Sequence, residues 1–329
     1  MSCPRVSVLL PVRDEEEYLT EALDSVAAQT LGDLEAIVVD DGSRDGTAAL
    51  AEAYARRDRR FRVIRQAPGG VVAAAERARA EARAPLVSMM TGDDVATPDR
   101  LELQAAAIEE EGLAAVGGQV EYFPATTDGM RTYGRWLNGL VTVEAALRDA
   151  FVECPLPGPG LTVRAELVSY RDPGWPEDYD LVLRLWAAGG RFRNLDRLVL
   201  RWREHPERIS RTQPQYSLDA FRRCKVHYLR QTLLAGGRPA VVWGSGPTGK
   251  AFVRELLRAG TPVAAFVDVD PRKLGKRIHG APVVPVEQAA AFPGTLALGA
   301  VAGAEGRARV REAAAALGLA EGTDFIAVA

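Results

Sequence analysis

The sequence is poor in the residues on which disulfide-rich, histidine-rich and membrane-spanning proteins depend. Its three cysteines form no CxxC pair, which fits free thiols in a reducing compartment. The only histidines are His205, His227 and His279, which excludes a histidine-rich metal centre. No apolar run approaches the length of a membrane span, and an apolar strand begins almost at once, without a signal peptide. We therefore expect a cytoplasmic protein, with peripheral membrane contact left open.

A strong charge of either sign is also missing. The formal net charge is −3, so no global basic field points to nucleic acid, and we expect no such partner. The hydrophobic content of 47% is ordinary for a globular protein, and 329 residues predict two domains.

The sequence does contain, from its start, an alternation of short apolar strands and amphipathic helices. We expect strands at residues 5–12, 34–39, 61–64 and 86–90, with helices between them. A further helix should begin at Pro98, with Thr97 as its cap, and end at Gly112. Continuous apolar strands joined through helices predict an α/β fold, with a mostly parallel sheet covered by helices on both faces.

Two of these strands end in a pair of aspartates, Asp40 and Asp41 in one case and Asp93 and Asp94 in the other. Right-handed crossovers place both ends at one edge of the sheet, where α/β proteins bind their ligands. Adjacent carboxylates repel each other unless a cation or hydrogen-bond donors compensate them, and oxygen ligands favour magnesium or manganese. The alternative is that these are solvated loop aspartates. The acids Glu15–Glu17 are interpreted as compensation of a helix dipole.

Four segments carry a resemblance to a known family. They are PVRDEEEYL, VVDDGS, TGDDVATPDRL and, at residues 175–185, WPEDYDLVLRL. In this order they resemble the motifs of family 2 glycosyltransferases with a GT-A fold, over residues 4–212. The resemblance implies a nucleotide-sugar donor, a divalent metal (Mn²⁺ or Mg²⁺), and inversion at the anomeric carbon during hexosyl transfer. It also implies a carbohydrate or glycolipid acceptor, in cell-envelope polysaccharide synthesis.

The resemblance assigns the nucleotide pocket to the first two motifs. By position, Asp41 would accept a hydrogen bond from the base, most commonly uracil and hence a UDP-linked donor, with Asp40 nearby. Pro11, Val12 and Asp14 would line the pocket. The Asn-x-Gly signature usual before the third helix is replaced by residues 67–70, APGG, so we assign no contacts to that loop.

The metal and diphosphate site is implied by the third motif and by a loop after residue 202. Asp93 matches the last acid of the DxD metal motif, with Asp94 beside it, whereas Thr91 stands in place of the first acid. His205 lies in a segment resembling a loop that closes over the diphosphate and can supply a histidine to the metal; a plain surface histidine is the alternative. Arg203 is expected to contact phosphate.

The catalytic base is implied by the fourth motif. An acceptor hydroxyl is a poor nucleophile, so a carboxylate must take its proton on the face opposite the leaving group. Asp178 matches the family's base, with Glu177 as its rival. The alternative is that these acids only complement the N-terminus of a helix.

A second α/β unit is expected after a helical linker. The predicted boundaries are 1–212 for the glycosyltransferase domain, 213–237 for the linker and 238–329 for a Rossmann-like accessory domain, whose length is too short for six strands. A G-x-G-x-x-G turn at Gly244, Gly246 and Gly249 follows a strand, and Asp268 ends the next one.

This C-terminal segment resembles the nucleotide-sugar-binding-like domain that precedes the acyltransferase repeats of bacterial sugar acyltransferases, although such repeats are missing here. Two alternative functions stay open. One is NAD-linked oxidoreductase activity in this domain, and the other is a protein that binds a nucleotide sugar without turnover. The sequence does not indicate an oligomeric state.

Overall fold

A computed structural model describes residues 3–329. The chain divides into two compact units. The first unit runs to Leu147 and resumes at Pro155–Gln213, and the second comprises Arg148–Cys154 and Pro214–Ala329. The division at residue 213 lies close to the predicted boundary of 212, and the helix of the predicted linker falls in the second unit. Among the described residues, no helix combines the length and apolarity that crossing a bilayer requires.

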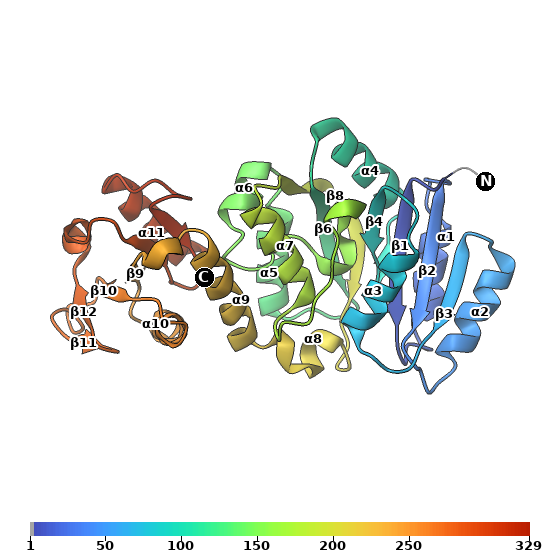
Figure 1. Ribbon diagram of the computed structural model, residues 1–329, viewed down its shortest axis with the longest axis horizontal. Coiled ribbons are helices and arrows are strands. Elements are labelled where there is room, and N and C mark those ends of the chain that lie inside the picture. The colour runs from blue at the N-terminus through green and yellow to red at the C-terminus, as the bar shows by residue number, and fades with distance from the viewer. Residues whose placement is uncertain (1–2) are drawn as a thin grey trace. The chain divides into compact units, whose positions relative to one another are not determined.

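The first unit is built on an eight-stranded sheet in the order β3-β2-β1-β4-β7-β6-β8-β5 (Figure 1). The strands are β1 (Val6–Val12), β2 (Leu34–Asp40), β3 (Phe61–Arg65), β4 (Leu86–Met89), β5 (Val95–Ala96), β6 (Ala115–Phe123), β7 (Thr162–Arg164) and β8 (Phe192–Arg203). Strands β1 to β4 are parallel, whereas β7 is antiparallel to both β4 and β6. The four strands predicted from the apolar runs are therefore confirmed, and the carboxyl ends of β1, β2 and β4 share one edge.

Helices cover both faces of this sheet because its central strands are apolar throughout. The helices are α1 (Leu19–Ala27), α2 (Thr47–Arg57), α3 (Val71–Glu81), α4 (Arg100–Glu111), α5 (Asp128–Asn138), α6 (Val143–Arg148), α7 (Glu177–Ala187) and α8 (Ile209–Thr212). Every residue of β1 and β2 is buried. Val8 and Leu10 of β1 pack with Leu19 and Leu23 of α1 in the main core, and α3 packs on β1 and β2.

Helix α4 begins two residues later than predicted. Val95 and Ala96 pair with β8, and the Thr97 amide donates to the Val199 carbonyl at 3.0 Å, so the chain stays extended through Thr97. The helix therefore starts at Arg100. Its predicted end is confirmed, because Gly112 adopts the left-handed conformation with φ of 65°.

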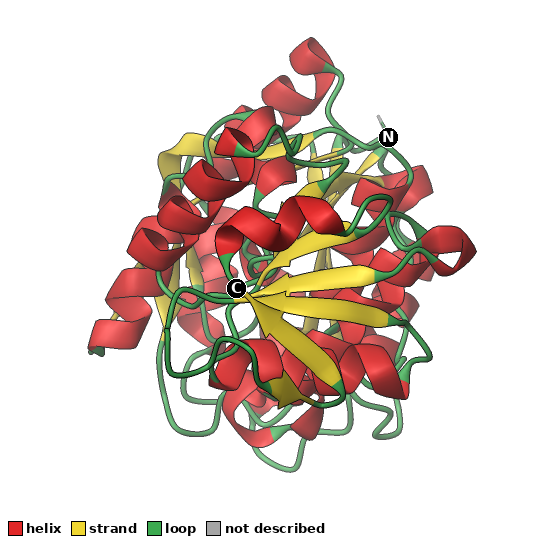
Figure 2. Ribbon diagram, turned by 90° about the vertical axis from the view of Figure 1, so that its left-hand side faces the viewer, coloured by secondary structure: helices red, strands yellow, loops and turns green. Residues whose placement is uncertain are grey.

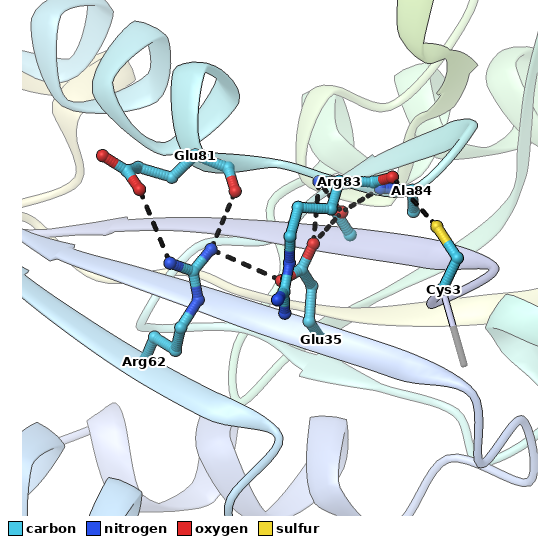
Figure 3. A network of polar contacts seen from close by, with 7 residues as sticks. Cys3, Glu35, Arg62, Glu81, Arg83 and Ala84 are labelled. Atoms are coloured by element: carbon cyan, nitrogen blue, oxygen red, sulfur yellow. Dashed lines mark hydrogen bonds and ion pairs between the residues drawn. The ribbon is translucent and has the colours of Figure 1, made fainter. Parts of the chain in front are cut away.

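At the opposite edge of the sheet, where the parallel strands begin, one buried carboxylate is surrounded by hydrogen-bond donors. Glu35, the second residue of β2, accepts hydrogen bonds from the Ser7 hydroxyl at 2.7 Å and from Nη2 of Arg83 at 2.6 Å. Arg62 lies 3.4 Å from the same carboxylate (Figure 3). Although burial opposes it, hydrogen bonding from Arg83 and Ser7 lowers the pKa of Glu35 below its ordinary value. This buried charge is fully compensated within the fold.

The second unit contains a six-stranded sheet in the order β11-β12-β10-β9-β13-β14, whose twisted strands are yellow in Figure 2. The strands are β9 (Ala240–Trp243), β10 (Val263–Val267), β11 (Arg277–Ile278), β12 (Ala281–Val284), β13 (Leu296–Gly299) and β14 (Phe325–Ala327). The helices are α9 (Leu218–Gln231), α10 (Pro247–Arg258) and α11 (Ala304–Ala316). The expectation of fewer than six strands was wrong. Six fit because none exceeds five residues and a tight hairpin links β11 to β12.

Candidate active site at the carboxyl edge of the first sheet

Three carboxylates crowd together where β1 and β4 end. Glu15 follows β1, and its carboxyl group lies so close to the Gly92 backbone that a Cβ at Gly92 would be 1.7 Å from Glu15 Oε2. That oxygen is buried without a hydrogen-bond partner. Burial, and then the charges of Asp93 and Asp94, raise the pKa of Glu15 well above its ordinary value. The fold thus holds Glu15 in a place that disfavours its charge.

Asp94 is turned into the protein and held from both sides. Its Oδ2 accepts a hydrogen bond of 2.6 Å from the Thr91 hydroxyl, and its Oδ1 accepts one of 2.7 Å from the Arg203 backbone amide. Burial, and then the neighbouring charge of Asp93, raise its pKa to about 8. Thr91 therefore serves as a hydrogen-bond donor to Asp94. An acid at position 91 would instead add another negative charge to the cluster.

Asp93 meets the loop that follows β8. His205 Nε2 lies 3.0 Å from Asp93 Oδ2, although the two residues are 112 positions apart in the chain. His205 also packs against Tyr18, with ring centroids 5.0 Å apart. Arg203 fixes this loop, because its Nε donates to the Asp93 carbonyl at 2.7 Å and its guanidinium covers the ring of Tyr18. The structure thus brings together the residues assigned by sequence to metal and diphosphate.

These residues fit an open metal site better than a closed one. Within residues 3–329, no group of three or more histidine, cysteine, aspartate or glutamate side chains is arranged to hold a metal ion. Asp93 and His205 nevertheless offer an oxygen and a nitrogen ligand that converge at 3.0 Å. Mg²⁺ commonly takes one or two protein ligands and completes its shell with water and substrate phosphates. The donor set therefore fits a metal shared with a diphosphate.

Asp41 is anchored by the loop before α3. Its Oδ1 accepts hydrogen bonds of 2.7 Å from both the Gln66 side chain and the Gly69 amide, and its Oδ2 accepts one of 2.8 Å from the Gly70 amide. Arg13 Nη1 lies 3.6 Å from Oδ2. The APGG segment that replaces the usual signature thus contacts Asp41, which the sequence did not predict.

The other residues assigned to the nucleotide pocket lie at the ends of β1 and β2. Pro11 and Val12 are buried in β1, and the Val12 carbonyl accepts from the Asp41 amide at 2.9 Å. Asp14 is exposed with φ of 55°, and its Oδ1 accepts from the Arg44 amide at 2.7 Å. Asp40 is buried, and its Oδ1 accepts from the Ser43 amide at 3.1 Å, whereas its Oδ2 accepts no hydrogen bond and lies 3.7 Å from Nε of Arg65.

The acids at the start of α7 separate into two environments. Asp180 is completely buried and forms ion pairs with Arg171 at 2.8 Å and Arg184 at 3.0 Å. Asp178 is half-buried, and a Cβ at Gly158 would lie 2.5 Å from its Oδ2. Burial, and then the charges of Glu177 and Asp178, raise the pKa of Tyr170. Asp180 is thus a structural anchor of α7.

Comparison with known proteins shows what the first part of the chain is similar to. Residues 7–160 match the model of Glycosyl transferase family 2. This part of the chain is therefore similar to family 2 glycosyltransferases. The chain is 37% identical over 114 residues to an uncharacterized glycosyltransferase, EpsJ of Bacillus subtilis, covering 35% of this chain and 33% of EpsJ. The match to this relative therefore spans about a third of its length.

Solved structures confirm the GT-A glycosyltransferase fold that the sequence predicted. S. aureus TarS 1–349 in complex with UDP-GlcNAc has a TM-score of 0.56 at 19% identity, over 69% of this chain and 66% of that one. The mannosyltransferase PcManGT from Pyrobaculum calidifontis, in complex with GDP-Man and Mn²⁺, has a TM-score of 0.53 at 17% identity, over 98% of this chain and 82% of that one.

Glu15 is a member of this acidic cluster that sequence reasoning did not place there. We interpreted Glu15–Glu17 as dipole compensation, and Glu16 does accept a hydrogen bond of 2.9 Å from the Gly46 amide ahead of α2. Glu15 instead enters the acidic cluster, because Gly92 leaves room for its carboxyl group. The only sequence signal was the glycine between Thr91 and Asp93, at a strand end that also carries acids.

Proposed function

We propose that this protein transfers a hexosyl group from a nucleoside-diphosphate sugar, UDP-linked, to an acceptor hydroxyl, with inversion at the anomeric carbon. The observation that carries the proposal is the crowding of Glu15, Asp93 and Asp94 at the carboxyl edge of a sheet in a region similar to family 2 glycosyltransferases. Like charges held together with a buried unpaired oxygen suit a site whose compensating cation arrives with the ligand. The structural neighbours bound to UDP-GlcNAc and GDP-Man support a nucleotide-sugar donor.

Asp41 would bind the nucleotide base. A carboxylate has about two acceptor positions on each oxygen. Oδ1 of Asp41 already receives two hydrogen bonds and Oδ2 receives one, so a base N–H would bind at Oδ2. Pro11, Val12, Asp14 and Asp40 complete the proposed nucleotide pocket.

Asp93 and His205 would hold a divalent metal, Mn²⁺ or Mg²⁺, and Asp94 would position their loops. We assign Asp94 this role because both of its oxygens already accept hydrogen bonds from the protein. The chemistry that a bound metal supplies is charge stabilisation of the departing nucleoside diphosphate. Arg203 would contribute through Nη1, since its Nε and Nη2 are engaged by the Asp93 carbonyl and Glu21.

Asp178 would take the proton of the acceptor hydroxyl. It is half-buried, as is Glu177, whereas Asp180 is fully buried and its charge is neutralised by two arginines. Glu177 is the rival base. Transfer would form the bond from the acceptor oxygen to the anomeric carbon, break the bond to the diphosphate, and leave the proton on Asp178.

The experiment is transfer by an Asp178→Asn variant, preceded by a nucleotide-sugar screen with and without Mn²⁺ to find the donor. We expect the rate to fall by about a hundred- to ten-thousand-fold, while calorimetry shows donor affinity nearly unchanged. Glu177→Gln is the matched control and should retain most of the rate. Full transfer by Asp178→Asn would refute the base assignment, and loss only in Glu177→Gln would move it to Glu177. Absence of turnover with every sugar nucleotide would favour the binding protein without turnover.

The remaining assignments are predictions that follow from this function. We predict that the acceptor is a carbohydrate or a glycolipid and that the protein acts in cell-envelope polysaccharide synthesis. We also predict a cytoplasmic location with peripheral membrane contact. Domain boundaries at 1–212 and 238–329, with a Rossmann-like accessory domain after the linker, are predictions as well.

A further inference from the structure

Helix α4 begins with an arginine that the fold buries completely. Arg100 is 1% exposed, and its Nη2 donates at 2.6 Å to the Met89 carbonyl and at 2.9 Å to the Ser88 hydroxyl. Its Nε donates to Gln104 Oε1 at 3.2 Å, and its Nη1 donates to the weak acceptor Sδ of Met90 at 3.3 Å. None of these acceptors is a carboxylate. Burial therefore lowers the pKa of Arg100 to about 10.

A buried cation of this kind is costly for a fold. Taking a charge out of water is compensated only where an opposite charge lies against it, and apolar side chains of similar size are often as stable or more stable in such places. Helix α4 packs into the main core through Leu101, Ala105 and Ile108, which needs no charge at position 100. Stability alone therefore does not explain Arg100, and a costly buried polar group is expected at or near a functional site.

Gln104, one turn further along α4, connects this arginine to a second part of the sheet. Its side chain is completely buried, and its Oε1 accepts from Arg100 and, at 2.7 Å, from the Thr162 hydroxyl of β7. Its Nε2 donates to the Gly160 carbonyl at 2.7 Å and to the Gly117 carbonyl at 3.2 Å. A side-chain amide offers two acceptor and two donor positions, and here all four are used.

The two ends of this network lie beside the proposed catalytic groups. Met89 is the last residue of β4, and the acidic loop, residues 91–94, follows it closely in the chain. At the other end lies the 3₁₀ turn Gly158–Gly160, whose last carbonyl accepts from Gln104. This turn packs against Asp178, because a Cβ on its first glycine would lie 2.5 Å from Asp178 Oδ2. One buried network thus joins the acidic loop to the turn beside the proposed base.

We propose that Arg100 and Gln104 are positioning residues for sugar transfer, which hold the acidic loop and the turn beside Asp178 in one fixed relation. The catalytic part of this inference rests on the proposed function. The donor and the base have to meet at opposite faces of one anomeric carbon, and a misplacement of about 1 Å can cost about a hundredfold in rate. A guanidinium suits this role, because its rigid fork of donors bonds several oxygens at once.

The test is a matched pair of variants of the full-length protein. Gln104→Glu keeps both acceptor positions of the side chain but puts an oxygen in place of the donor to two backbone carbonyls. Gln29→Glu makes the same change in a second buried amide, which donates to the Thr97 carbonyl at 2.7 Å ahead of α4. Both should lower the urea midpoint by similar amounts. Only Gln104→Glu should lower kcat, by at least about tenfold, with the donor KM within about twofold of wild type.

Two substitutions of Arg100 test the other end of the network. Arg100→Met removes every donor and should lower kcat at least about tenfold, because the strand end that leads into the acidic loop loses its anchor. Arg100→Lys keeps one cationic donor and should recover at least about threefold of that loss, which a purely steric role would not predict. The Gln104→Glu result stands on its own if Arg100→Met fails to fold.

Hydrogen exchange measured by mass spectrometry adds a readout that needs no turnover. Residues 89–94 and 158–162 should both exchange at least about tenfold faster in Arg100→Met, but only 158–162 in Gln104→Glu, with residues 34–40 unchanged in each. Unchanged exchange in these segments, or an equal loss of kcat in Gln29→Glu, would overturn the proposal.

The kinetic outcomes separate this inference from the function on which it rests. An active wild type whose Gln104→Glu and Arg100→Met variants keep full kcat would overturn the positioning role alone. A wild type that turns over no sugar nucleotide would overturn the proposed function and the positioning role together.

Discussion

The two edges of the first sheet treat buried carboxylates in opposite ways. At the amino edge, Glu35 receives hydrogen bonds from Ser7 and Arg83, and its pKa is lowered. At the carboxyl edge, Glu15 has an unpaired buried oxygen, and the pKa values of Glu15 and Asp94 are raised. The same fold therefore satisfies one buried acid with donors and, at the other end of the strands, leaves an oxygen of Glu15 without a donor. Under the proposed function, the metal bound with the donor would compensate the acids at the carboxyl edge.

The presence or absence of compensating donors distinguishes structural acids from candidate functional acids more clearly than burial does. Asp180 and Asp268 belong with Glu35, because arginine, lysine or hydroxyl donors compensate each of them. Acids whose pKa is raised, as in Glu15 and Asp94, are candidates for a functional cluster, whereas Glu35, Asp180 and Asp268 are compensated within the fold. The following changes test this difference, from the largest expected effect to the smallest.

Asp93→Asn should have the largest effect, on transfer. It removes one of two proposed metal ligands, and losing one charge-stabilising group typically costs about a hundred- to a thousand-fold in rate. The concentration of Mn²⁺ for half-maximal transfer should also rise. Asp99→Asn, which removes an acid that is paired with Arg197 beyond the cluster, is the control and should change the rate less than twofold. An unaltered response to Mn²⁺ in Asp93→Asn would remove Asp93 from the metal site.

Glu35→Gln should be the most destabilising change of a single acid at the amino edge. The amide would place N–H groups against the donors of Arg83 and Ser7, and hydrogen bonds to charged groups contribute about 1.5–3 kcal/mol. We expect the free energy of unfolding in urea to fall by about 2 kcal/mol, with the transfer rate of the folded protein unchanged. Glu109→Gln, at the exposed pair with Arg5, should cost under about 0.5 kcal/mol. Equal losses of stability in the two variants would mean that the network in Figure 3 stabilises the protein no more than an exposed ion pair does.

The stabilising effect of Glu35 should depend on pH. Because its folded-state pKa lies below the ordinary value of 4.5, its contribution is fully present above 4.5 and is lost as pH falls through the folded-state pKa. The stability difference between wild type and Glu35→Gln should therefore be constant from about pH 5.5 to 7.5 and shrink below about 4.5. Urea midpoints measured from pH 3 to 7.5 test this, and a difference that stays constant down to pH 3 would contradict it.

The sequence predicted a strand or helix correctly where the residues of that element alone indicate it. Strands β1, β2 and β4 are buried on both faces and appear as continuous apolar runs, and Gly112 marks the end of α4. The start of α4 was misplaced because Val95 and Ala96 pair with β8, a strand about a hundred residues later. Six strands in the second unit were missed because β11 and β14 are only two and three residues long.

The candidate site was readable only in part, for the same reason. Strand ends reveal which acids lie at one edge of the sheet, so the position of Asp41 and Asp93 at that edge could be predicted, whereas their roles stay predictions. Sequence does not reveal the donors that reach them: the Gly69 and Gly70 amides at Asp41, or the Arg203 amide at Asp94. Whether an acid is compensated depends on such distant partners, and therefore the surroundings of Glu15 and Asp94 could not be predicted from the sequence.

Glu15→Gln should have the smallest effect and the opposite sign to Glu35→Gln. Burial and the charges of Asp93 and Asp94 disfavour ionised Glu15, so a neutral side chain of the same shape relieves repulsion. At pH 7.5 and without metal, we expect a gain of about 1 kcal/mol in the free energy of unfolding, because an unsatisfied buried acceptor costs about that much. Glu17→Gln, in the same loop but exposed, should change nothing measurable. If Glu15→Gln destabilises the protein instead, its carboxyl group is satisfied within the fold, and the contrast between the two edges does not hold.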